Sequence, residues 1–110
     1  MRRGDVVTVA AGAGYGGKPR PAVIVQSDDF AATASVTVCL VTSHGIDAPL
    51  LRLALVPDPG NGLTASSWIM VDKIVTAPRA SVRQRIGALS PGDLLRLNRA
   101  LAVFLGIAGA

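Results

Sequence analysis

The stretch SVTVCLVT, residues 35–42, decides the fold. It is rich in β-branched side chains and almost continuously apolar, which is typical of a strand that is buried on both faces. His44 and Gly45 end it. We therefore expect residues 35–42 to form a central strand of a small barrel.

Further segments with strand character lie on both sides of this stretch. They are residues 6–10, 22–25, 50–56 and 67–76. Turn-forming residues separate them, most densely in the cluster PDPGNG at 57–62. Five strands at this spacing predict a compact β barrel.

The end of the chain predicts an amphipathic helix. Ser90 is a suitable N-cap, with Pro91 at the first helical position and Asp93 three residues after the cap. Apolar side chains then recur at helical spacing, and Gly106 is suited to end the helix. We expect this stripe to pack on the barrel: Leu94, Leu97, Leu101 and Phe104. The fold class is thus mainly β (α+β), with a C-terminal amphipathic helix.

Composition restricts the chain to one globular domain over residues 1–110. Half of its 110 residues are apolar and 16% are charged, the opposite of a disordered chain. The longest run of apolar or small residues, 100–110, is about half of the roughly 20 that a membrane-spanning helix needs. Cys39 is the one cysteine and has no disulfide partner within the chain. We expect a cytoplasmic protein that does not bind membranes.

Positive charge gathers in the second part of the chain. Residues 73–110 carry six basic side chains and one acidic side chain. Nine of the eleven basic residues are arginine, whose planar guanidinium suits phosphate and carboxylate partners. Charge alone is equally consistent with an anionic partner and with a solvated basic surface.

Most standard catalytic sites are excluded by residue content. The chain has no glutamate, so paired glutamates are not available. Its one cysteine lies in an apolar run and is expected to be buried, which excludes a Cys-His pair with His44. One histidine and scattered aspartates lack the spacing of metal ligands. Cleavage of RNA remains possible, because the ribose 2′-hydroxyl of RNA is itself the nucleophile. A protein then needs only to position the scissile phosphate, stabilise its developing charge and assist proton transfer.

Several segments together resemble the MazF/PemK toxin family in order and approximate spacing over nearly the whole chain. The matching segments are RGDVV at 3–7, KPRPAVIVQSD at 18–28, VTS at 41–43, GL at 62–63 followed by SWIMVDKI at 67–74, and IG at 86–87 leading to LS at 89–90. The resemblance implies an SH3-like barrel of the CcdB/PemK kind, with five to seven strands. It also implies a homodimer and a sequence-specific, metal-independent endoribonuclease without a cofactor.

The resemblance also implies that this chain cleaves single-stranded RNA and leaves a 2′,3′-cyclic phosphate and a 5′-hydroxyl. The substrate would be mRNA, with tRNA and rRNA as further candidates, and a cognate antitoxin would neutralise the toxin. The family's catalytic arginine falls on Arg20 and its catalytic threonine on Thr42. The glycine-rich stretch 12–17 resembles the family's mobile loop that covers RNA. Where many members have a basic residue, this chain has Val75.

Further residues are candidates for RNA binding. They are Lys18, Ser43, His44, Lys73 and Arg79. Arginine keeps its proton at neutral pH and is therefore a poor general base, whereas histidine is suited to proton transfer. His44 is therefore a candidate for proton transfer. The alternative, which is the more common case, is a solvent-exposed loop histidine before Gly45 that has no catalytic role. Trp68 either stacks on a base or packs in the core or an interface.

Two other function classes stay open at this point. One is a non-enzymatic toxin that binds a topoisomerase, as the related CcdB family does on the same barrel, although such a toxin needs neither Arg20 nor Thr42. The other is an inactive barrel that only binds a protein. Cleavage of single-stranded RNA in the presence of a chelator would separate the ribonuclease from both.

Overall fold

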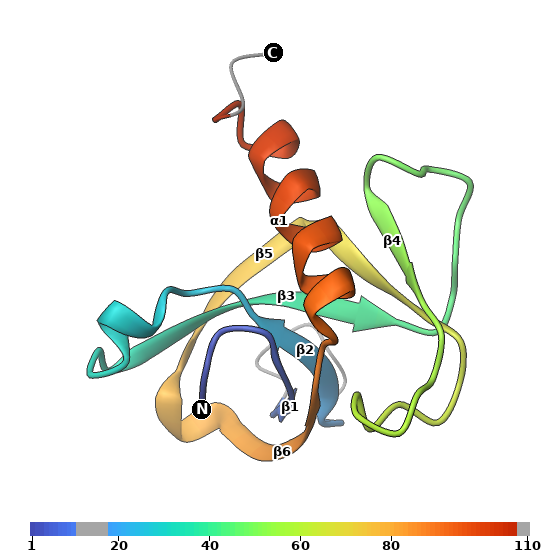
Figure 1. Ribbon diagram of the computed structural model, residues 1–110. Coiled ribbons are helices and arrows are strands. Elements are labelled where there is room, and N and C mark those ends of the chain that lie inside the picture. Colours follow the sequence, from blue (N-terminus) through green and yellow to red (C-terminus); the bar gives the residue numbers. More distant parts are fainter. Residues whose placement is uncertain (11–17, 108–110) are drawn as a thin grey trace.

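One antiparallel sheet of six strands and one C-terminal helix make up the fold (Figure 1). The computed structural model describes residues 1–10 and 18–107. Its elements are β1 (Asp5–Val9), β2 (Arg20–Ile24), the 3-10 turn η1 (Asp28–Phe30), β3 (Ser35–Thr42), β4 (Arg52–Leu55), β5 (Ser67–Pro78), the 3-10 turn η2 (Arg79–Ser81), β6 (Val82–Ala88) and α1 (Pro91–Phe104). The expected mainly β class with a C-terminal helix is confirmed.

The sheet is an open one rather than a closed barrel. Its strand order is β4-β5-β3-β2-β1-β6, so β3 lies inside the sheet as expected, while β4 and β6 are the edges. The turn after β4 packs against the β6 edge, where the Ala88 amide donates to the Gly60 carbonyl (2.9 Å). At the other edge, Arg96 of α1 donates to the Ala54 carbonyl of β4 (3.1 Å). Among the described residues, these contacts protect the edges without closing the barrel.

Strand β6 is missing from the strands that the sequence predicts. Its residues Arg83, Gln84 and Arg85 are all exposed, so they show no alternation of apolar and polar side chains. The cause is the β1–β6 ladder, whose register shifts twice, between Val6 and Val7 and between Thr8 and Val9. Such irregularities break the two-residue period on which recognition of a strand depends.

The side chains of β3 enter two separate apolar clusters. Val38 and Leu40 belong to one cluster, which includes the neighbouring residues of β1 and β2. Cys39 and Val41 belong to the other, to which α1 contributes Leu97 and Leu101. Both faces of this strand are buried, which is the property that its nearly continuous apolar sequence predicts.

The helix begins and ends as its sequence predicts. Ser90 Oγ accepts a hydrogen bond from the Asp93 amide (3.1 Å). After the last turn, Gly106 has a φ of +73° and the Ile107 amide donates to the Ala102 carbonyl (2.9 Å), which is a Schellman motif. The expected packing of Phe104 is wrong, since this side chain is 43% exposed. The helix extends beyond the strands there, as Figure 1 shows.

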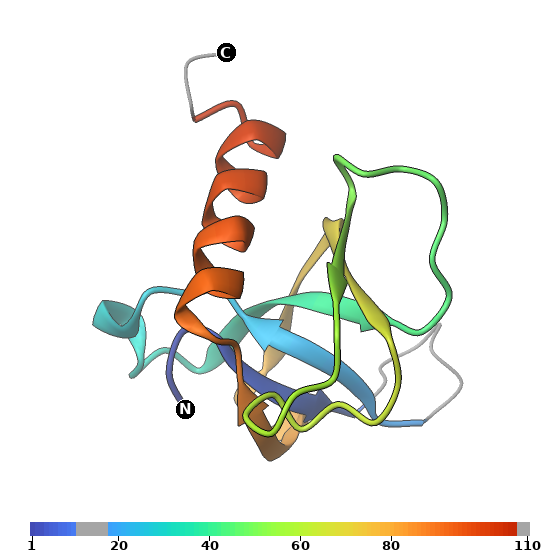
Figure 2. The same cartoon turned by 45° about the vertical axis from the view of Figure 1, so that its right-hand side comes forward.

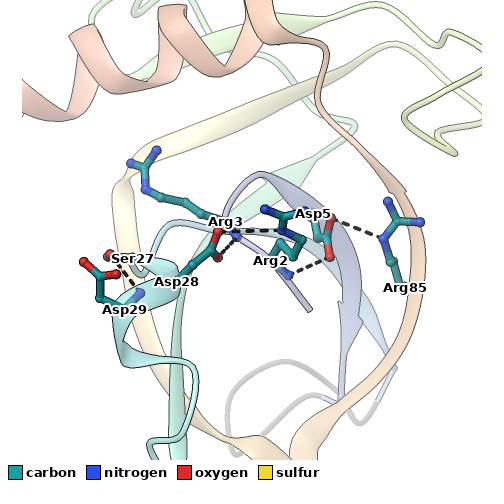
Figure 3. Close-up of polar contacts among 7 residues, drawn as sticks. All are labelled: Arg2, Arg3, Asp5, Ser27, Asp28, Asp29 and Arg85. Atoms are coloured by element: carbon teal, nitrogen blue, oxygen red, sulfur yellow. Dashed lines mark hydrogen bonds and ion pairs between the residues drawn. The ribbon is translucent and has the colours of Figure 1, made fainter.

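A polar network fixes the N-terminal residues against the sheet (Figure 3). Asp5 is nearly buried, accepts from the Arg2 amide (2.8 Å) and pairs with Arg85 Nε of β6 (3.2 Å). The Arg3 amide donates to Asp28 Oδ1 beside η1 (2.7 Å). These contacts join β1, β6 and the segment after β2, and they neutralise one of the arginines in the basic half of the chain.

Candidate functional site

A cavity of about 440 Å³ collects four of the residues that the sequence singles out. Its lining includes Arg20, Thr42, Ser43 and His44. The lining also includes the segment 62–65 that precedes β5, Thr8 of β1 and Ile86 of β6. Figure 2 shows the turn after β4 in yellow-green, folded beneath the strands toward β6. Residues from five distant parts of the chain therefore meet in one place.

The pairing of β2 with β3 explains why Arg20 and Thr42 line the same cavity. In the β2–β3 ladder, Ala22 pairs with Leu40 and Val23 with Cys39. Arg20 is the first residue of β2 and Thr42 the last residue of β3, so the antiparallel pairing of these strands brings both to the same end of the ladder. Two residues that are twenty-two positions apart in the sequence therefore line the same cavity.

Thr42 is held in place by the turn that follows it. Its Oγ1 accepts a hydrogen bond from the His44 amide (3.1 Å), and its main chain lies opposite Trp68 of β5. Because the oxygen accepts this bond, the hydroxyl proton remains available for a group in the cavity. The same bond fixes the path of the chain through Ser43 and His44, both of which are exposed.

The Trp68 indole packs against the backbone of Gly45. A Cβ atom built on Gly45 would lie 2.6 Å from Cε2 and Cζ2 of that ring, so a side chain at this position would have to displace the indole or the loop. Trp68 does not line the cavity. Of the two interpretations of this tryptophan, the structure favours packing: the ring supports the segment that carries His44.

Three hydroxyl side chains in the cavity were not singled out from the sequence. They are Thr8 of β1, Thr64 and Ser67. Ser67 is buried, and its Oγ donates to the Ala65 carbonyl (2.8 Å). Serine and threonine are common at strand ends, so the sequence offers no signal that separates these three from structural hydroxyls.

The charge of the cavity favours an anion. Of the described residues that line it, Arg20 is the one cation and none is a carboxylate. Within residues 1–10 and 18–107, no three His, Cys, Asp or Glu side chains come together as a metal site. One arginine, one imidazole and several hydroxyl groups suit a phosphodiester.

Other predicted RNA-binding residues lie outside this cavity. Lys18 is exposed two residues before Arg20, and Lys73 is exposed on β5. Arg79 of η2 donates from Nε to the Thr33 carbonyl (2.9 Å). The glycine-rich stretch 12–17 lies outside the residues that the structure describes. Lys18, Lys73 and Arg79 do not line the cavity that contains Arg20, and their role stays a prediction.

The basic half of the chain is partly neutralised. Arg85 pairs with Asp5, and Arg96 pairs with Asp93 (2.8 Å). Among the described residues, Lys73, Arg83 and Arg99 form no ion pair. The positive charge that remains is therefore smaller and more dispersed than the sequence indicates.

Burial determines the state of Cys39. The side chain lies in the core cluster that contacts α1. Burial raises the pKa of its thiol from an ordinary 9.0 to about 11, a shift that the nearby Arg3 opposes and Asp72 reinforces. The thiol stays protonated at neutral pH and does not line the cavity.

No helix among the described residues has the length and apolar character needed to cross a bilayer.

Comparison with known proteins places the chain among toxins. Residues 2–105 match the family described as "PemK-like, MazF-like toxin of type II toxin-antitoxin system". A "probable endoribonuclease MazF" from Mycolicibacterium smegmatis is 54% identical over 109 residues, which cover 99% of this chain and 100% of that protein.

Solved structures share the fold. An "endoribonuclease in complex with its cognate antitoxin from Mycobacterial species" superposes with a TM-score of 0.79 at 27% identity, over 96% of this chain and 95% of that one. The Mycobacterium tuberculosis toxin MazF-mt6 gives 0.78 at 20% identity, over 93% and 96%. With a family match over nearly its whole length, the chain belongs to the PemK-like, MazF-like toxins of type II toxin–antitoxin systems.

Proposed function

We propose that this toxin is an endoribonuclease that cuts single-stranded RNA in a sequence-specific and metal-independent manner. The observation that carries the proposal is the meeting of Arg20, Thr42, Ser43 and His44 in one cavity without carboxylates. The relative from M. smegmatis, 54% identical and named a probable endoribonuclease, supports the same activity.

The reaction requires no external nucleophile. The ribose 2′-oxygen attacks the adjacent phosphorus, the bond from phosphorus to the 5′-oxygen breaks, and no water is consumed. The products carry a 2′,3′-cyclic phosphate and a 5′-hydroxyl. One proton leaves the 2′-oxygen and one is delivered to the departing 5′-oxygen, so the site needs charge stabilisation and proton transfer but no bound metal ion.

The residues divide these tasks by their chemistry. Arg20 is always protonated, so it stabilises the negative charge that develops on the phosphoryl oxygens. The Thr42 hydroxyl donates to the same oxygens, because its own oxygen is engaged by the His44 amide. The imidazole of His44, which also lines the cavity, transfers protons. Ser43 contacts the RNA strand.

Basic residues outside the cavity bind the RNA on either side of the cleavage site. Lys18 lies just before Arg20, and Lys73 and Arg79 lie on β5 and η2. Contacts of this kind are with backbone phosphates and are sensitive to salt. Neutralising each residue should weaken RNA binding to a similar extent for all sequences, and the slope of affinity against salt should fall.

The direct test is cleavage of a single-stranded RNA by the purified protein in the presence of a chelator. Arg20→Ala should abolish nearly all cleavage without loss of the folded state, measured by circular dichroism. Arg99→Ala is the matched control, since it removes an exposed arginine on α1, away from the cavity. Cleavage at the wild-type rate by Arg20→Ala, or no cleavage by the wild type, would refute the proposal.

A second copy of the chain is the proposed partner at the end of α1. Large apolar side chains are exposed there: Val103, Phe104, Leu105 and Ile107. They border a second cavity of about 540 Å³, with Leu105 and Ile107 in its lining. Exposed apolar surface of this kind marks protein contacts. Sedimentation should give a dimer for the wild type and a monomer for Leu105→Asp.

A cognate antitoxin is the second proposed protein partner. One solved structure similar to this chain is an endoribonuclease with its cognate antitoxin. An acidic segment would be attracted to the unpaired cations of this toxin, among them Lys73 and Arg83, and would exclude RNA by the same charge. We expect a small acidic protein encoded beside this gene to suppress cleavage when the two are mixed.

A further inference from the structure

The cavity is larger than a phosphate group requires. Its volume of about 440 Å³ lies within the range of pockets that hold a small ligand. Arg20, Thr42, Ser43 and His44 account for part of its lining, and a scissile phosphate would occupy only the space beside them. The lining that remains includes the segment 62–65, so a base or sugar next to that phosphate could contact this segment.

The wall at 62–65 offers both apolar and polar contacts. Leu63 and Ile86 both pack against the apolar cluster that includes Val41, and all three line the cavity, while Thr64 adds an exposed hydroxyl. Within the described residues, the amide of Thr64 and the carbonyl of Leu63 have no hydrogen-bond partner in the protein. Bases of single-stranded RNA are recognised through such edge hydrogen bonds and apolar contacts to their faces.

Asn61 fixes this wall from behind. Its side chain is 1% exposed. Its Oδ1 accepts from the amides of Asp58 (3.2 Å) and Leu63 (3.0 Å), and its Nδ2 donates to the Val56 carbonyl (2.9 Å). The Leu63 amide is therefore held by the buried side chain of Asn61. The turn cannot shift without breaking these buried hydrogen bonds.

Close backbone contacts hold the same turn against β6. Gly62 has a φ of +72°, and a Cβ atom there would collide with the Ile86 carbonyl. A Cβ atom on Gly87 would collide with the main chain of Gly60 and Asn61. Two glycines thus allow the turn and the strand to touch. A wall held this rigidly is preorganised, and preorganisation lowers the entropic cost of recognising a ligand.

We infer that the segment Gly62–Ala65 reads the base next to the scissile phosphate, with Leu63 and Thr64 as specificity-determining residues and Asn61 as the positioning residue. The inference rests on the proposed ribonuclease function and concerns its specificity. The phosphate is held at Arg20 and Thr42, so every RNA can be bound there. Discrimination arises across the cavity, where the fixed peptide groups and the Thr64 hydroxyl accept one base edge and not another.

The experiment compares cleavage preferences on an RNA library with random sequence around one position. Sequencing of the cut ends gives the preference of the wild type, Thr64→Val, Leu63→Ala and the control Val56→Ala. The control removes apolar atoms from the same connection at a side chain that is 73% exposed. Thr64→Val and Leu63→Ala should lower the ratio of kcat/KM between the preferred base and its best competitor about tenfold to a hundredfold, and Val56→Ala should leave it unchanged.

The positioning role of Asn61 has its own readout. Asn61→Asp retains the shape but replaces the donor to the Val56 carbonyl with an acceptor. If Asn61 positions the wall, the variant should show a weaker base preference as well as any loss of cleavage rate. If Asn61 is only structural, the cleavage rate should fall equally for all sequences.

Failure of this inference can be distinguished from failure of the proposed ribonuclease function. Wild-type cleavage with the same base preference in Thr64→Val and Leu63→Ala, or an equal loss of rate for every sequence, would overturn this inference and leave the ribonuclease function intact. Failure of the wild type to cut any RNA would overturn the function itself, and the inference with it.

Discussion

The main-chain amide of His44 donates a hydrogen bond to Thr42 Oγ1 over 3.1 Å. This bond gives the threonine one defined role, since its oxygen accepts from the protein and its proton is free for the substrate. It also couples the end of β3 to the histidine that lines the cavity.

Thr42→Val removes the hydroxyl with little change in shape. We expect cleavage to fall about 10²–10³-fold, the usual effect of losing one donor to a developing oxyanion. Thr37→Val is the matched control on the same strand, because Thr37 Oγ1 bonds to Thr76 Oγ1 (2.8 Å) away from the cavity. Single-turnover rates on one RNA would decide, and equal rates for both variants would contradict the role of Thr42.

His44→Ala tests proton transfer. If the imidazole acts as a general acid or base, the rate should fall about 10²–10⁴-fold and the pH–rate profile should lose the limb that a titrating histidine contributes. The profile, measured for the wild type and the variant, separates this role from simple RNA contact. An unchanged rate and profile would show that His44 is an ordinary loop residue.

Gly45→Ala tests the support that Trp68 gives to this segment. A methyl group 2.6 Å from the indole must displace the ring or the loop, and overpacking of this kind costs about 1–3 kcal/mol of unfolding free energy. Cleavage should fall as His44 moves. The double variant Gly45→Ala/Trp68→Leu should recover part of both losses. A simple sum of the two single effects, measured by denaturant unfolding, would argue against direct contact.

Cys39 predicts a dependence of stability on alkaline pH. Its folded pKa of about 11 lies above the ordinary 9.0, so the folded state favours the protonated thiol. The stabilisation is complete below pH 9 and is lost as the pH rises toward 11, up to about 2–3 kcal/mol. Cys39→Ala should have a flatter curve of unfolding free energy against pH in this range. Parallel curves for the two proteins would refute the shift.

Most of the fold follows from local sequence, and its exceptions have physical causes. Residues 35–42 and the helix start at Ser90 are strong local signals, and both are confirmed. Strand β6 was missed because its bulged pairing with β1 exposes three consecutive polar residues. Phe104 has the right spacing for the core, but spacing does not reveal that the helix extends beyond the sheet.

The site was predictable only in part. Arg20 and Thr42 follow from the family resemblance, while their meeting in one cavity depends on a pairing of β2 with β3 that no local pattern encodes. Asn61 and Thr64 gave no signal, since an asparagine in a turn cluster is expected whether or not it supports a cavity. Their arrangement arises from the packing of the 57–62 turn on β6.

The two-sided burial of β3 bears on how the strand finds its partners. In a sheet with one wet face, a slip of one residue exposes apolar side chains and is strongly penalised. Here Val38 and Cys39 both enter apolar clusters, so polarity gives little protection against such a slip. Protection must come from the strand's polar borders, where Gln26 Oε1 accepts from the Thr37 amide (3.1 Å) and Thr37 meets Thr76. The hydrogen bonds of Thr37 would be lost if β3 shifted by one residue, so these polar side chains fix the register of a strand whose apolar side chains do not.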